Sequence, residues 1–185
     1  MSPHYLLITA PASEPITVAE VKAHGRIDTD EDDGYLADLI VGVRKEAEQH
    51  TNRALLTQTW EWVGDAFPSI IELARCPVAS ITSIKYLDDA GVEQTLAAAN
   101  YRADLESEPA RITPAYGKTW PSTYGVSNAV RVRFVAGWAT RAAVPESIRH
   151  KLKVLCLDRY DRRGSIEFGE GMGVGSLFFG ERVWI

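Results

Sequence analysis

The stretch Val130-Arg131-Val132-Arg133-Phe134-Val135 places large apolar side chains at alternate positions, with arginines between them. Such alternation predicts a half-buried β-strand, because successive strand side chains point to opposite faces of a sheet. The stretch closes a longer region, from Leu56 to Trp138, that is rich in Thr, Val, Ile, Tyr and Trp and is punctuated by turn residues. That composition predicts a β domain, which decides the fold class of the chain.

Further short strands are predicted within this region. Gln58-Thr59-Trp60-Glu61-Trp62 also alternates, and the stretch from Ile81 to Tyr86 runs into the turn Asp88-Asp89-Ala90-Gly91, which is a β-hairpin signal. Two more strands flank a turn around Pro109, and residues 114–128 carry the prolines and glycines of a surface loop. Because no helical period separates these strands, the region is predicted to form an antiparallel β-sandwich or small barrel.

Helices are predicted on both sides of the β region. Thr17-Val18-Ala19-Glu20 fits a capping box, and the helix that it starts is expected to end at Gly25 in a left-handed C-cap. A second helix is predicted over residues 31–51, with an apolar stripe at helical spacing and Asn52 as its terminator. A third helix is predicted to begin at Pro145, since proline suits the first position of a helix.

The chain is therefore predicted to have an α+β fold in three parts. Residues 1–55 and 140–164 are expected to form a small helical bundle from two N-terminal helices plus a C-terminal helix. Residues 56–139 are expected to be an antiparallel β domain inserted into that bundle, and residues 165–185 an extended C-terminal tail.

In the tail, glycines alternate with large apolar side chains. A glycine-rich segment is entropically costly to order, and apolar rings exposed on it need a cover. We therefore expect a docking arm that becomes ordered on a partner, and the alternative is a tail tucked against its own domain. The side chains expected to dock are Phe168, Met172, Leu177, Phe178, Phe179 and Trp184.

Charge is distributed unevenly along a chain whose formal net charge is −5. Residues 1–55 are acidic, whereas residues 141–163 are basic. Opposite charges predict that these segments meet, either within one subunit or between neighbouring subunits. The candidates for contacts between subunits are Asp30, Asp32, Asp33, Arg149, Lys153 and Arg162.

The sequence carries no recognisable catalytic or cofactor motif. The four histidines lack metal-ligand spacing, no Cys-x-x-Cys pair occurs, and no phosphate-binding loop is found. We therefore expect no enzyme activity, no cofactor and no metal, and Cys76 and Cys156 are predicted to be buried free thiols. The acidic balance argues against sequence-specific DNA binding, and no apolar run has the length of a membrane span.

The chain resembles phage head–tail connector proteins. The resemblance rests on the segment from Glu14 to His24, the segment from Thr51 to Trp60, and the segment from Cys76 to Tyr86 with the acidic turn that follows it. Shorter matches follow in order at Asn100-Tyr101-Arg102, Ala110-Arg111-Ile112, residues 129–138 and Val144-Pro145-Glu146-Ser147-Ile148-Arg149. The ordered set extends to about Gly164, and the tail matches least.

This resemblance implies a structural neck adaptor of a long-tailed phage or a gene transfer agent, made in the host cytoplasm and located in the virion at the head–tail interface. Such a protein would form a ring beneath the portal, expected to be dodecameric, and would extend the DNA channel used in DNA packaging. It would join the head to the next neck protein, a stopper or tail terminator. DNA would pass through the lumen without sequence-specific binding, and no membrane is implied as a partner.

A second class of function stays open from the residues alone. The loop aromatics Tyr116, Trp120 and Tyr124 would suit stacking against sugar rings. The β domain would then be a glycan- or receptor-binding decoration of a virion. The plainer interpretation is that these rings pack against the β domain itself.

Overall fold

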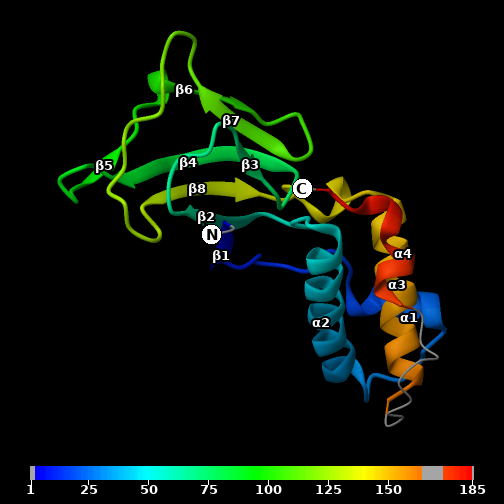
Figure 1. The fold of residues 1–185 in the computed structure, drawn as a ribbon. Helices are drawn as coiled ribbons and strands as arrows, with labels where there is room; N and C mark the ends of the chain where they lie inside the picture. Colours follow the sequence, from blue (N-terminus) through cyan, green and yellow to red (C-terminus); the bar gives the residue numbers. More distant parts are fainter. Residues whose placement is uncertain (1–2, 164–172, 185) are drawn as a thin grey trace. The chain divides into compact units, whose positions relative to one another are not determined.

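The computed structural model describes residues 3–163 and 173–184, which have the α+β architecture expected from the sequence. These residues separate into two compact units (Figure 1). The helical unit comprises the described residues of 12–56 and 138–183, and the β unit comprises those of 1–11 and 57–137 together with Trp184. No helix in the described part of the chain is both long and apolar enough to cross a bilayer.

The helical unit is built on three helices and a short C-terminal one (Figure 1). Their bounds are Val18–Gly25 for α1, Asp33–Thr51 for α2, Glu146–Asp161 for α3 and Val174–Leu177 for α4. Two short 3₁₀ turns, Arg141–Ala143 and Phe179–Glu181, complete the unit. α2 contacts both α3 and α4, so the C-terminal helix belongs to this unit.

Local signals fix the start of α1 as predicted, and the helix ends at Gly25 as expected, but its C-cap residue differs. The Thr17 hydroxyl accepts the Glu20 amide at 3.1 Å, and the Glu20 carboxylate accepts the Thr17 amide at 2.7 Å, which confirms the capping box. The expected C-cap at Gly25 is wrong, because Arg26 takes the left-handed conformation, with φ of 54°. Gly25 serves close packing instead, since a Cβ there would lie 2.5 Å from Leu157 of α3.

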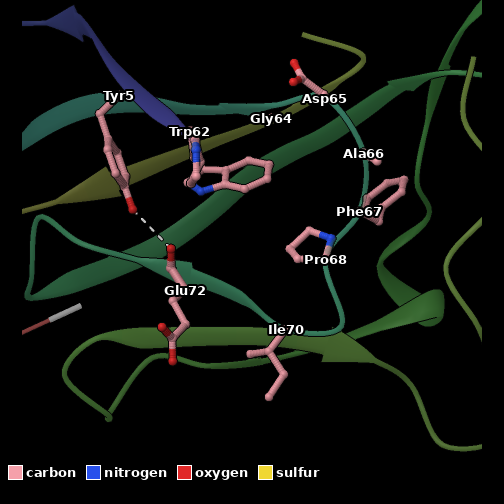
Figure 2. A pocket seen from close by; sticks show the side chains of 10 residues that line it. Tyr5, Trp62, Gly64, Asp65, Ala66, Phe67, Pro68, Ile70 and Glu72 are labelled. Carbon is pink, nitrogen blue, oxygen red and sulfur yellow. Dashed lines mark hydrogen bonds between the residues drawn. The ribbon is translucent and has the colours of Figure 1, made fainter. Parts of the chain in front are cut away.

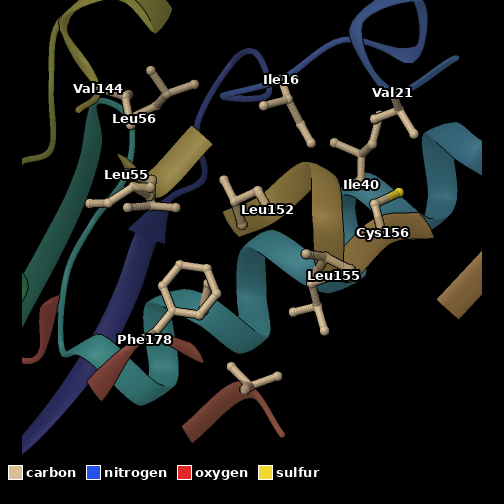
Figure 3. Packing of buried hydrophobic residues seen from close by; sticks show 14 of the residues in the cluster. Ile16, Val21, Ile40, Leu55, Leu56, Val144, Leu152, Leu155, Cys156 and Phe178 are labelled. Carbon is tan, nitrogen blue, oxygen red and sulfur yellow. The ribbon is translucent and has the colours of Figure 1, made fainter. Parts of the chain in front are cut away.

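The core of the helical unit forms where the apolar faces of its helices meet (Figure 3). Burying each large apolar side chain stabilises the fold by about 1.5–3 kcal/mol. The buried members are Ile16, Val21, Leu36, Ile40, Val43, Ala47, Leu55, Leu56, Val144, Ile148, Leu152, Leu155, Cys156, Val174 and Phe178. α2 also ends as predicted, with Asn52 in the left-handed conformation at φ 55°.

One carboxylate is buried beside this apolar core. Glu48, which is 5% exposed, accepts the Leu55 amide at 2.9 Å and an Arg44 Nη1–H at 2.7 Å. Arg44 Nε donates in turn to the Glu14 carboxylate at 2.7 Å. The network therefore ties α2 to the segment before α1 and to the turn through which the chain leaves α2.

The β unit contains two antiparallel sheets. The strands are β1 (His4–Thr9), β2 (Gln58–Gly64), β3 (Ile71–Leu73), β4 (Val78–Leu87), β5 (Glu93–Thr95), β6 (Tyr101–Asp104), β7 (Ala110–Pro114) and β8 (Val130–Ala136). One sheet has the order β1-β2-β8-β4-β5 and the other the order β3-β7-β6 (Figure 1). The larger sheet ends at β1 and β5, so the described strands form no closed barrel, and the barrel alternative is not borne out.

The sequence patterns of the β region correspond closely to the strands. The alternating stretch Val130-Arg131-Val132-Arg133-Phe134-Val135 lies in β8, the central strand of the larger sheet. The hairpin of β4 and β5 turns at Asp88-Asp89-Ala90-Gly91, as predicted. Arg131 and Arg133 lie on the face of the sheet opposite the buried aromatic rings of β2 and β8. Each donates to the Glu61 carboxylate at 2.9 Å. β1 was not predicted, because His4–Thr9 has no alternating pattern of apolar and polar residues.

The Tyr5 hydroxyl links the two sheets. Tyr5 in β1 donates to the carbonyl oxygen of Glu72 at 3.0 Å, and its oxygen accepts the Ala74 amide at 2.9 Å. Burial raises the pKa of Tyr5 to about 12, which keeps the hydroxyl neutral and able to donate.

We predict that Glu48→Ala lowers the free energy of unfolding of the helical unit by about 3 kcal/mol, because it leaves Arg44 half-satisfied and the Leu55 amide without its acceptor. Urea denaturation followed by circular dichroism measures the change. Glu46→Ala is the matched control, since that carboxylate forms a surface pair with Arg159 and its loss should cost about 1 kcal/mol or less. Equal losses for the two variants would contradict the structural role of Glu48.

We predict that Tyr5→Phe destabilises the protein by about 1–2 kcal/mol at neutral pH, because the Ala74 amide loses its acceptor. The folded-state pKa of Tyr5 is raised, so its contribution is fully present below the unfolded value of about 10 and is lost as pH rises toward 12. The difference between wild type and variant should therefore shrink across that window. Tyr116→Phe, at a fully exposed tyrosine, is the control and should leave the free energy of unfolding unchanged both at neutral pH and within that window.

Candidate functional site

The C-terminal segment, defined as residues 173–184, is held against the end of α2 by three hydrogen bonds. Val183 N donates to the Thr51 carbonyl oxygen at 2.8 Å. Asn52 Nδ2 donates to the Val183 carbonyl at 2.9 Å, and Arg53 Nε donates to the Glu181 carbonyl at 2.7 Å. The described part of the tail is therefore not an extended chain, because its backbone groups find partners at the C-terminal turn of α2.

Two adjacent phenylalanines in this segment have opposite environments. Phe178 is 1% exposed and belongs to the apolar core, as Figure 3 shows, with the Lys151 ammonium 5.8 Å from its ring centre. Phe179 is 64% exposed. Glu181, just beyond them, accepts from Lys151 at 3.1 Å and from Ser147 at 3.2 Å, which fixes the segment on α3.

The six side chains expected to dock therefore fall into three groups. Phe168 and Met172 lie outside the described residues. Phe178 is inside the core, and Leu177 is half-buried against the same cluster. Only Phe179 and Trp184, at 64% and 59% exposed, are open apolar surfaces. A partner would meet these last two first.

The acidic and basic segments meet within the subunit. Asp32 at the start of α2 accepts from Arg163 at 2.7 Å and from the Tyr160 hydroxyl at 2.6 Å. Arg163 also covers the Tyr160 ring, 4.5 Å from its centre. The hydrogen bonds from Arg163 and Tyr160 lower the pKa of the Asp32 carboxyl below its usual value.

The other five charged candidates are paired inside the subunit as well. Lys22 binds both acidic partners in the segment before α2, and the remaining pairs lie along α3. The pairs are Asp30–Lys22, Asp33–Lys22 at 2.8 Å, Arg149–Glu146, Lys153–Glu146 at 3.7 Å and Arg162–Asp158 at 2.9 Å. Any contact between subunits through these groups would have to share or replace the internal pairs.

The loop aromatics do not share one environment. The Trp120 ring stacks on Phe67, with ring centres 4.8 Å apart and planes 9° from parallel. Phe67 also meets Tyr86 edge-on at 5.6 Å. Tyr116 is fully exposed and Tyr124 is 46% exposed. One face of Trp120 is thus occupied by its own domain, which favours a packing role for that ring.

The β unit contains a half-open pocket of about 670 Å³ (Figure 2). Its lining is Pro3, Tyr5, Trp62, Gly64, Asp65, Ala66, Phe67, Pro68, Ile70 and Glu72. Its titratable groups already have structural duties: Tyr5 joins the sheets, and the Asp65 carboxylate accepts the Asn128 amide at 2.8 Å. The lining contains no pair of nucleophile and base.

The described residues contain no cluster of His, Cys, Asp and Glu that could hold a metal ion. Cys76 and Cys156 are both buried free thiols, as predicted. Burial raises the pKa of Cys156 to about 11, so it is not a thiolate nucleophile at neutral pH.

Comparison with known proteins places this fold. Residues 15–87 match the family model described as phage gp6-like head-tail connector protein. A chain in the neck of an empty GTA particle, computed with C6 symmetry, superposes with a TM-score of 0.81 at 25% identity, covering 98% of this chain and 96% of that one. A comparison with curated protein sequences finds no match.

Two other solved structures have the same fold. One is a chain of the virion of the native gene transfer agent particle, with a TM-score of 0.77, and the other is a chain of the neck of the native GTA particle computed with C12 symmetry, with a TM-score of 0.72. Each is 24% identical and covers 98% of this chain and 96% of its own length.

We predict that Phe178→Ala lowers the free energy of unfolding by about 3–4 kcal/mol, because it opens a cavity between α2, α3 and the C-terminal segment. Phe179→Ala, one residue along, should change it by about 0.5 kcal/mol or less. Thermal and urea denaturation of the two variants measure the contrast. A similar, small effect at both positions would mean that the segment is not part of the core.

Proposed function

This chain belongs to the head–tail connector proteins of phages and gene transfer agents, and we propose that it forms a ring beneath the portal that joins the head to the tail-side neck proteins. The observation that carries the proposal is the superposition over 98% of the chain on a subunit of a particle neck. The connector match over residues 15–87 supports it independently. The family is a structural one, and no step of catalysis is part of the proposal.

A closed ring follows from the symmetry of the relatives. Necks computed with C6 and C12 symmetry consist of copies related by rotation, and each copy in such an arrangement presents two different, complementary faces. A dodecamer would match the twelvefold case. The charged set is a secondary source of contacts: the Asp30 side chain is 88% exposed beside Lys22, and an exposed pair of this kind contributes little to stability. Sharing it with a neighbouring subunit therefore costs little.

The portal is the proposed partner of the C-terminal segment. Phe179 and Trp184 are exposed apolar rings on a segment that is anchored by Phe178 and by the bonds to Thr51. An anchored segment loses less conformational entropy on binding than a free tail does, so its exposed rings can contribute more to affinity. Phe168 and Met172, outside the described residues, are proposed to extend the same contact.

The lumen of the proposed ring is a passage for DNA. A subunit with a net charge of −5 offers few phosphate contacts, and each such contact would retard the moving duplex. The opposite rim is proposed to meet the next neck protein, a stopper or tail terminator. The acidic balance thus suits a channel better than a site of sequence recognition.

We predict that the purified chain assembles on its cognate portal as a coaxial ring visible by electron microscopy. The double variant Phe179→Ala/Trp184→Ala should weaken that assembly by about tenfold or more while remaining folded, because it removes two exposed aromatic contacts. Tyr116→Ala, at a fully exposed aromatic of the β unit, is the matched control and should assemble like wild type. Deleting residues 165–185 is a poorer test, since it also removes Val174, Phe178 and Val183 from the core.

Failure of the wild-type chain to associate with intact portals would contradict the adaptor proposal. Binding of the same chain to glycans in that case would support the decoration module instead. If the double variant assembles at wild-type concentrations, Phe179 and Trp184 are not the docking residues. The ring proposal would then stand, with other residues contacting the portal.

A further inference from the structure

The first strand leaves an apolar edge open. Among the described strands, β1 pairs with β2 alone and forms one end of the five-stranded sheet. Its central residues Leu6, Leu7 and Ile8 are 40%, 46% and 43% exposed. The strand contains no lysine, arginine, aspartate, glutamate or proline. Edge strands of monomeric proteins usually carry such residues because they prevent pairing with other chains, and here the only irregularity is one register shift between Leu7 and Thr9.

The other end of the same sheet is open along part of β4. β5 covers only the stretch Lys85 to Leu87 of that strand. Among the described strands, none pairs with the outer side of residues 79–83. These residues, Ala79, Ser80, Ile81, Thr82 and Ser83, carry no charge either. The sheet therefore has two uncharged open edges, one at each end.

We infer that these two edges bind each other between neighbouring copies, so that β1 of one subunit pairs with residues 79–83 of the next. This inference rests on the proposed ring and names its subunit interface. A cyclic assembly needs two different complementary faces on each copy, and opposite edges of one sheet are such a pair. The lengths are similar, with six residues in β1 and five in the open part of β4, where the strand has two register shifts against β8.

The chemistry of the two edges favours a second copy as the occupant. Strand addition pairs the free backbone groups of both edges, and neither edge carries a charge that would repel the other or need desolvation. The contact would also cover part of Leu6, Leu7 and Ile8, which are exposed in the single subunit.

Register identifies matched positions for a test. Leu6 lies opposite Glu61, Glu61 opposite Arg133, and Arg133 opposite Ser83, so these four side chains share one face of the sheet. Ser80 lies opposite Val135, two residues from Arg133 and therefore on the same face. Leu6 of one copy and Ser80 of the next would then lie on one continuous face across the interface.

Leu6→Lys and Ser80→Lys should each prevent ring closure on the portal, because a lysine at an edge opposes strand addition. Both positions are exposed, so both variants should keep the wild-type circular dichroism spectrum and melting temperature. Native mass spectrometry of complexes with the cognate portal counts the bound copies. Each variant should need about tenfold or more higher concentration than wild type to fill the portal, while single copies still bind. Tyr116→Lys, which adds the same charge at a fully exposed position, should fill it normally.

The double variant Leu6→Lys/Ser80→Glu should recover ring filling relative to Leu6→Lys, since opposite charges then face each other at every interface. Rings of Leu6→Lys or Ser80→Lys that form at wild-type concentrations would overturn the inference and leave the adaptor proposal intact. A double variant no better than Leu6→Lys would overturn the pairing of these two edges. If the wild-type chain forms no ring on the portal, the adaptor proposal fails, and this inference fails with it.

Discussion

The buried carboxylate of Glu48 is the constraint on which the helical unit depends. A carboxylate away from water is tolerated only where its oxygens find hydrogen-bond donors, and Glu48 finds them in Arg44 and in the amide of Leu55. Those partners lie on α2 and on the segment that leads to β2. Through Arg44 the same network reaches Glu14, in the segment that leads to α1. One polar network therefore fixes the segment through which the chain enters the helical unit and the segment through which it leaves. The chain makes a long β excursion after the second segment, so both segments need a defined position.

Elements with strong local signals could be predicted from the sequence. The Thr17–Glu20 capping box, the left-handed Asn52 and the alternation of β8 each depend on neighbours within a few residues, and all three are present in the structure. β1 and α4 could not be predicted in this way. β1 is held by pairing with β2, and α4 by burial of Val174 in the helical core, and both contacts are distant in sequence. Gly25 shows the same limit, since its close neighbour Leu157 lies on another helix.

The candidate site was predictable in composition but not in geometry. The sequence indicated that the acidic and basic segments would meet, and Asp32 with Arg163 shows that they meet within one subunit. Phe178 and Phe179 are indistinguishable as residue types, yet one is in the core and the other is exposed. Their difference arises from the bonds that hold residues 181 and 183 on α2 and α3, which set the direction of each side chain. The docking role is therefore left to the exposed rings.

The central claim is that this chain is a ring component of a particle neck. Immunogold electron microscopy of intact particles, with antibodies raised against the purified chain, tests that claim most directly. Gold is expected to label a single position on each particle, at the junction between head and tail. Gold distributed over the head shell or along the tail would contradict it and would instead indicate a decoration protein.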